Sequence, residues 1–165
     1  MRVLNLWIVL LLAFMHISSA AQELKVAAVF SDNMVLQQQT QTPIWGWAKK
    51  GSKVCVTTSW DDKTYETVAD EVGKWKLGIA TPSAGGPYSI TVSASETVKL
   101  QNVYIGEVWL ASGQSNISMR LKGYKHQPVI GSTEAILQSK GKKIHFINIP
   151  ELAAYKPLDD IKNAK

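Results

Sequence analysis

The sequence is poor in the residues that cross-link or metallate small domains. Cys55 is the single cysteine among 165 residues, so no disulfide can form within the chain. Histidine occurs only at His16, His126 and His145, and no Cys or His cluster has the spacing of a zinc site. We therefore expect no metal and no other cofactor. Because Cys55 lies inside a strand-like run, we expect it to pack as a small hydrophobic side chain.

Charged residues are also sparse, since Asp, Glu, Lys and Arg make up 19% of the chain while 45% is hydrophobic. This balance excludes disorder over the whole chain and favours a packed core. The net charge is +5, and much of the excess lies after residue 116, where nine Lys or Arg stand against four Asp or Glu. Because these lysines are scattered singly, without interleaved aromatic residues, we predict a solvated surface and no nucleic-acid partner.

The sequence lacks an apolar run long enough to span a membrane, which needs about 20 residues. An apolar stretch at 4–14 follows the lone charge of Arg2 and precedes several small residues. This order predicts a secretory signal peptide over residues 1–21, cleaved near Ala20 or Ala21, rather than a transmembrane anchor. We expect the mature chain to be exported to the periplasm or the extracellular space, without a stable membrane span.

Residues 22–103 have the pattern of short strands separated by turns, without a clear helix. Seven or eight such strands, with turns every eight to twelve residues, predict an all-β antiparallel sandwich. The hairpin turn at 61–63 and the apolar alternation at 88–93 are the clearest signals. We expect the tryptophans of these strands to pack between the sheets, with stacking on sugars as the alternative; they are Trp45, Trp47 and Trp75.

The pattern changes near Val103, where we place a domain boundary. An apolar run at 104–111 predicts a strand buried on both faces. Residues 132–138 predict a helix capped by Ser132 or Thr133 and ended by Gly141, and residues 143–150 predict a second strand. Strand, helix and strand imply a βαβ unit. Two strands and two helices cannot cover a sheet on both faces, so residues 104–165 look like the truncated start of an α/β domain.

Ser115 is the candidate catalytic residue, because it follows the predicted buried strand and precedes one or two predicted helical turns. Such a junction exposes the hydroxyl and places backbone N–H groups beside it, as a serine nucleophile needs. A serine at this place can equally be a helix N-cap with no chemical role. The local context alone leaves these two interpretations about equal.

Four ordered blocks of the sequence resemble the N-terminal part of the sialate O-acetylesterase family, carbohydrate esterases with an SGNH-type hydrolase domain. The resemblance runs from about Val26 to the C-terminus, and it departs from the family at Ile117, where methionine is usual. The blocks are residues 30–38, residues 43–48, the pair 73–76 with 85–88, and residues 106–116, which contain Gly113-Gln114-Ser115-Asn116.

The resemblance implies an esterase that removes O-acetyl groups from sugars through an acetyl-enzyme on Ser115, whose backbone N–H also helps to bind the oxyanion. Gly113, Gln114 and Asn116 would support the turn. The family's Asp-x-x-His block is absent, so we expect this chain to be an inactive fragment; His126 and His145 are expected to be core or surface residues. The alternative is a secreted β-sandwich module that binds carbohydrate and carries a vestigial hydrolase stub.

Overall fold

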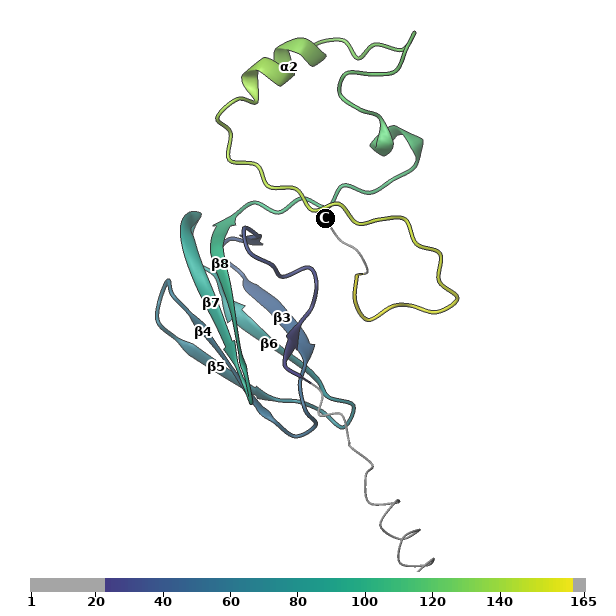
Figure 1. Cartoon of the computed structure of the whole chain (residues 1–165). Coiled ribbons are helices and arrows are strands. Elements are labelled where there is room, and N and C mark those ends of the chain that lie inside the picture. Colours follow the sequence, from purple (N-terminus) through teal and green to yellow (C-terminus); the bar gives the residue numbers. More distant parts are fainter. Residues whose placement is uncertain (1–22, 162–165) are drawn as a thin grey trace, which may run out of the picture.

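The computed structural model describes residues 23–161, so the predicted signal peptide lies outside the described residues (Figure 1). No helix within these residues has both the length and the apolar composition needed to cross a membrane. The elements are β1 Lys25–Val26, β2 Val35–Gln37, β3 Gln41–Trp47, β4 Lys53–Thr58, β5 Thr64–Val68, β6 Lys74–Ala80, β7 Gly85–Ser93, β8 Thr97–Gly106, the 3₁₀ turn η1 Ser115–Ser118 and α2 Ser132–Gln138.

Two sheets with a shared apolar core make up residues 25–106. One has three strands in the order β1-β3-β6, and the other has five in the order β2-β8-β7-β4-β5. Ile44 and Ile79 come from the first sheet, Val56, Val92 and Val103 from the second, and all are at most 1% exposed in a single cluster. The prediction of a mostly β chain with little helix is confirmed.

The strands form where the sequence alternates apolar and polar residues. In β4, Val54 and Val56 are fully buried while Cys55 between them is half-buried on the outer face, 3.8 Å from a Glu66 carboxylate oxygen. The sheet period of two therefore places Cys55 outside the core, and its predicted packing as a small hydrophobic side chain is only partial. The predicted hairpin is confirmed, because β4 and β5 pair antiparallel across the turn at 61–63.

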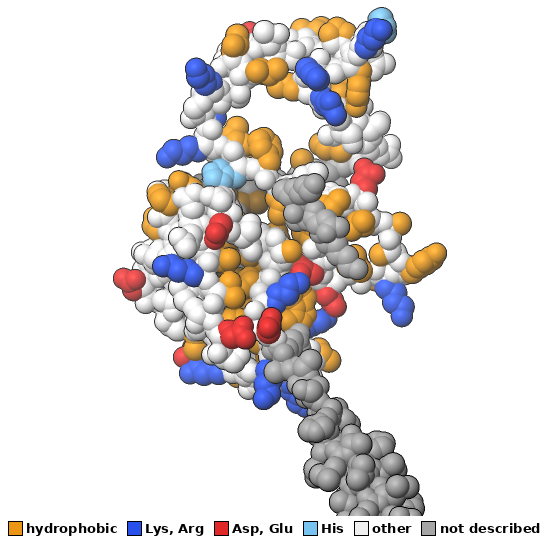
Figure 2. All heavy atoms as spheres, viewed as in Figure 1, with side chains coloured by type: hydrophobic (Ala, Val, Ile, Leu, Met, Phe, Trp, Pro, Cys, Tyr) orange, Lys and Arg blue, Asp and Glu red, His pale blue; other side chains and the backbone are white. Residues whose placement is uncertain are grey.

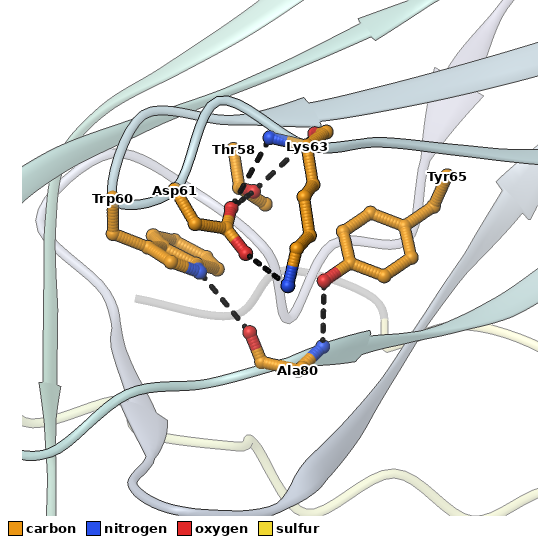
Figure 3. A network of polar contacts seen from close by, with 6 residues as sticks. All are labelled: Thr58, Trp60, Asp61, Lys63, Tyr65 and Ala80. Carbon is orange, nitrogen blue, oxygen red and sulfur yellow. Dashed lines mark hydrogen bonds and ion pairs between the residues drawn. The ribbon is translucent and has the colours of Figure 1, made fainter.

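A polar network joins this hairpin to the other sheet (Figure 3). The Trp60 indole N–H donates to the Ala80 carbonyl at 3.0 Å, and the Ala80 N–H donates to the Tyr65 hydroxyl at 3.2 Å. The buried Thr58 hydroxyl donates to Asp61 at 2.6 Å. Because Ala80 ends β6, these bonds hold the hairpin of the five-stranded sheet against the end of the three-stranded one.

One strand departs from the antiparallel prediction, because β2 runs parallel to β8, with Val35 opposite Tyr104. The cause lies in the turn before β2. The Asp32 carboxylate accepts the Gln101 N–H at 2.7 Å, and the Asn33 N–H donates to the Gln101 carbonyl at 3.0 Å. The turn is thus fixed beside the middle of β8, and the chain continues along β8 in the same direction.

The tryptophans divide between the two faces of the three-stranded sheet. Trp75 is 2% exposed and lies in the core as predicted. Trp45 and Trp47 lie on the outer face, because Ile44 between the sheets fixes the alternation of β3, so their predicted place between the sheets is wrong. The Trp45 ring packs edge-on against the Phe30 ring, with 4.6 Å between the ring centroids.

The predicted βαβ unit does not form. Between residues 107 and 161 only η1 and α2 have regular structure, and residues 143–150 form no strand. The helix at 132–138 is confirmed, although Gly131, with a φ of 76°, takes the N-cap position and neither Ser132 nor Thr133 caps it by a side chain. Residues 107–148 instead form an arch that stands clear of the sheets and exposes apolar side chains (Figures 1 and 2).

The return segment, residues 149–161, brings the chain back to the outer face of the three-stranded sheet. Asp160 forms an ion pair with Lys25 at 2.8 Å and accepts the Ala28 N–H at 2.8 Å, while Asp159 pairs with Lys74 at 2.8 Å. Burial acts to raise the pKa of Asp160, but the Lys25 ammonium and two backbone N–H groups outweigh it and lower the pKa. Asp159 and Asp160 also line an open hollow of about 420 Å³ beside Trp45.

Asp160→Ala is expected to release the return segment from the sheet. In the full chain, the Ala28 amide should exchange with solvent faster by about fivefold or more, because it loses a carboxylate acceptor. The lowered pKa means that the parent contact is complete above the ordinary aspartate pKa and is lost as the pH falls through the lowered value. Glu151→Gln, at an exposed site in the same segment, is the control; equal exchange in both variants would contradict this role.

Gly46 is expected to tolerate no side chain. A Cβ there would lie 2.0 Å from the Lys25 carbonyl oxygen and 2.8 Å from the Trp75 ring, so the glycine lets β1 approach β3. Gly46→Ala should destabilise the fold by about 3 kcal/mol or more, because the backbone of β1 would have to move. Gly78→Ala in β6 meets only ordinary contacts and should cost far less. Urea denaturation of both variants is the measurement, and equal midpoints would contradict the packing argument.

Candidate functional site

Ser115 lies at the start of the short 3₁₀ turn η1, within the arch. The turn is closed by two backbone bonds, from the Ile117 N–H to the Gln114 carbonyl at 3.1 Å and from the Met119 N–H to the Asn116 carbonyl at 3.2 Å. Ser115 is exposed, and no hydrogen bond among residues 23–161 involves its hydroxyl or its N–H. The predicted helical turn is therefore present, as a single 3₁₀ turn that begins at Ser115 itself.

The three neighbours of Ser115 predicted to support it are brought together by the turn. Gln114 is the N-cap residue and supplies the carbonyl that closes η1, and Asn116 supplies the next carbonyl. Neither uses its side chain in a hydrogen bond within the described residues. A Cβ on Gly113 would lie 3.7 Å from the Ile117 Cβ, an ordinary contact. The backbone of these residues, rather than their side chains, shapes the turn.

The segment that leads to Ser115 differs from the predicted buried strand. β8 ends at Gly106, and residues 107–114 have no regular structure. Trp109 and Leu110 are each 86% exposed, so the prediction that the run at 104–111 is buried on both faces is wrong from residue 107 onward. A strand buried on both faces needs paired neighbours and covering helices. Both neighbours of β8 end beside Gly106, since β2 ends at Gln37 and β7 begins at Gly85.

A polar cluster at the exit of β8 was missed by sequence reasoning. The Glu107 carboxylate accepts a hydrogen bond from the side-chain amide of Gln38 at 2.6 Å and another from that of Gln37 at 3.1 Å. These bonds, that of Gln38 being the stronger, lower the pKa of Glu107 below its ordinary value. The Gln37 side-chain oxygen accepts the Val108 N–H at 2.9 Å. The only sequence signal was a polar pair at the end of one strand and a glutamate at the end of another.

Neither histidine forms a catalytic pair with a carboxylate. His126 lies exposed in a turn with a φ of 74°. The His145 Nδ1–H donates to the Asn33 carbonyl at 2.5 Å, and its ring lies 5.3 Å from the Tyr104 ring. His145 therefore anchors the second foot of the arch to the sheets. Both residues are surface histidines, which is one of the two outcomes that the sequence predicted for them.

The site as described can supply a hydroxyl, a backbone N–H and little else. No three His, Cys, Asp or Glu residues within 23–161 are placed to hold a metal ion together. A serine hydroxyl attacks a carbonyl only when a neighbouring base takes its proton. Among the described residues no His or carboxylate forms a hydrogen bond with Ser115. Within the described residues, the geometry therefore supplies no base for Ser115.

Comparison with known proteins gives the following relatives. The chain is 26% identical to the sialate O-acetylesterase of Mus musculus over 164 residues, which cover 93% of this chain and 30% of that protein. It is 26% identical to the Homo sapiens sialate O-acetylesterase over 153 residues, which cover 87% of this chain and 28% of that protein. The chain thus spans less than a third of the length of these curated relatives. No protein-family model matches the chain.

A solved structure shares the fold. The crystal structure of a carbohydrate acetylesterase from Xanthomonas citri matches with a TM-score of 0.74 at 24% sequence identity, covering 87% of this chain and 32% of that one. The relatives in sequence and the neighbour in structure are all esterases. The resemblance predicted from the sequence blocks is therefore confirmed: over most of its length, this chain is similar to the sialate O-acetylesterases.

Proposed function

We propose that this chain carries the nucleophile of a carbohydrate O-acetylesterase, with Ser115 as the attacking residue. The observation that carries the proposal is the exposed hydroxyl of Ser115, at the start of a turn, within a chain similar to sialate O-acetylesterases over 93% of its length. Ser115 attacks the acetyl carbonyl, the sugar hydroxyl leaves, and water then releases acetate from the acetyl-enzyme. The Ser115 N–H stabilises the oxyanion of the tetrahedral intermediate.

The organisation of the chain follows from the same proposal. The boundary predicted near Val103 falls inside β8, which ends at Gly106, so the proposed β-sandwich domain ends there and the residues after it begin an SGNH-like hydrolase domain. The two sheets with one shared core support the sandwich, and the turn at Ser115 supports the hydrolase start. Residues 1–21 direct export to the periplasm or the extracellular space. The substrate is an O-acetylated carbohydrate, and no cofactor takes part.

The strand domain is expected to fold without the arch, because its core takes no side chain from residues 106–161. A polypeptide of residues 23–106 should melt in one cooperative transition with β-type circular dichroism. The same melt followed by tryptophan fluorescence should coincide with it. Two transitions, or a broad one, would show that the arch and the return segment are part of the folding unit.

The 165-residue chain by itself is expected not to hydrolyse acetyl esters above background. Loss of one member of a serine triad lowers turnover by on the order of 10⁴–10⁶, and here neither His126 nor His145 has a carboxylate to orient it. The measurement is hydrolysis of 4-nitrophenyl acetate by the chain beside its Ser115→Ala variant. Turnover that Ser115→Ala abolishes would reveal a base within the chain and contradict this interpretation of its histidines.

The test for activity joins this chain to the part of a relative that it does not cover. A chimera in which this chain replaces the matching 30% of the Mus musculus relative should release acetate from acetylated sugars and react with a fluorophosphonate probe at Ser115. Ser115→Ala should abolish both, whereas Ser118→Ala, at the other end of the same turn, should keep both. Sugar binding without labelling of Ser115 would favour a carbohydrate-binding module instead.

A further inference from the structure

The exit of β8 is held by side chains where the backbone ladder stops. In the parallel pair, Gln37 lies opposite Gly106, and the last backbone bond runs from the Gln38 N–H to the Gly106 carbonyl at 2.9 Å. The chain of β2 then turns away at Gln39, whose φ is 51° and whose N–H donates to the Pro82 carbonyl at 3.0 Å. No backbone carbonyl of β2 is left to accept the next N–H of the exiting chain.

Gln37 supplies the missing acceptor. Its side-chain oxygen accepts the Val108 N–H at 2.9 Å, and its side-chain nitrogen donates to Glu107 at 3.1 Å. Both ends of one amide therefore bind two consecutive residues of the exiting chain. An amide held at both ends allows one arrangement of the first peptide after the strand, because turning either group away breaks a second bond.

Gln38 repeats this arrangement toward a third segment. Its side-chain nitrogen donates to Glu107 at 2.6 Å, and its side-chain oxygen accepts the Ala84 N–H at 2.9 Å. The backbone of Gln37 is held as well, because the hydroxyl of Thr81, a residue 7% exposed, donates to the Gln37 carbonyl at 2.7 Å. The two glutamines are thus fixed to the sheets by their backbone and to Glu107 by their side chains.

We propose that Gln37, Gln38 and Glu107 form a positioning clamp that sets the direction in which the chain leaves β8 toward Ser115. The clamp does not depend on which reaction the chain takes part in. Only the statement that the clamped segment carries a nucleophile rests on the proposed function. Among the described residues, the Val108 bond is the only hydrogen bond between residues 108–142 and the strands. The next hydrogen bond to the strand region along the described chain is that of His145 to Asn33, at the far foot of the arch. The clamp is therefore the one anchor between the strands and Ser115 on its N-terminal side.

The donors and acceptors of the clamp allow a reciprocal test in the full chain. Glu107→Gln places a third side-chain amide against those of Gln37 and Gln38. One NH₂ group then faces another NH₂ group, and that hydrogen bond is lost. Gln37→Glu places two carboxylates together and removes a donor. The double variant restores the match of donors and acceptors. A carboxylate at 37 accepts both the Val108 N–H and a side-chain N–H of the amide at 107, and the oxygen of that amide still accepts from Gln38. Glu96→Gln, at an exposed glutamate beside β8, is the matched control.

The measurement is amide exchange and ¹H–¹⁵N chemical shift by NMR. Each single variant is expected to speed exchange at Val108 by about tenfold and to shift the resonances of residues 107–116. The amide resonances of Val56 and Val92, in the core, should not shift. The double variant is expected to return Val108 to within about threefold of the parent. Circular dichroism checks that the strands are intact in every variant.

Two results would overturn the clamp. Single variants that lower the melting temperature but leave Val108 and residues 107–116 unchanged would make these residues merely stabilising. A double variant no closer to the parent than the single ones would show that the three side chains do not act together. The proposed function fails separately, through absence of fluorophosphonate labelling at Ser115 in the chimera, a result that leaves the exchange test of the clamp intact.

Discussion

A β-strand persists only where a neighbour accepts its backbone hydrogen bonds, and this requirement divides the chain at Gly106. Before that point every strand finds a partner, and the inward residues of the two sheets fill one core. After it, β2 and β7 offer β8 no further partner. An unpaired strand exposes N–H and C=O groups to water and loses the order that the ladder supplied. The apolar run of Val108, Trp109 and Leu110 therefore lies open to solvent.

The same requirement explains which predictions held. The alternation at 88–93 and the turn at 61–63 depend on neighbouring residues alone, and the structure agrees with both predictions. Burial of Trp45 and Trp47 between the sheets depended on which face of β3 turns inward, and aromatic content does not decide that face. The parallel direction of β2 depended on bonds from Asp32 and Asn33 to Gln101, which lies almost seventy residues away. Contacts between distant residues leave no periodic trace in a sequence.

The candidate site was predictable only in its nucleophile position. Ser115 stands out because a turn signal follows an apolar run, and the turn is present at η1. The surroundings were not predictable, since Gln37 and Gln38 read as part of a polar loop and Glu107 as a flanking charge. Their role arises from parallel pairing of β2 and β8, which brings three polar side chains to one strand end. A single error in strand direction therefore hid the whole cluster.

The arch owes its placement to a few polar contacts. A large apolar side chain contributes about 1.5–3 kcal/mol when it is buried, but those of the arch, such as Trp109 and Phe146, remain exposed and contribute little. The anchors that remain are the clamp at Glu107, the His145 bond and the ion pairs of Asp159 and Asp160. Exposed ion pairs contribute only about 0–1 kcal/mol each. Because no core supports Ser115, the direction of the chain at the exit of β8 governs where its hydroxyl lies.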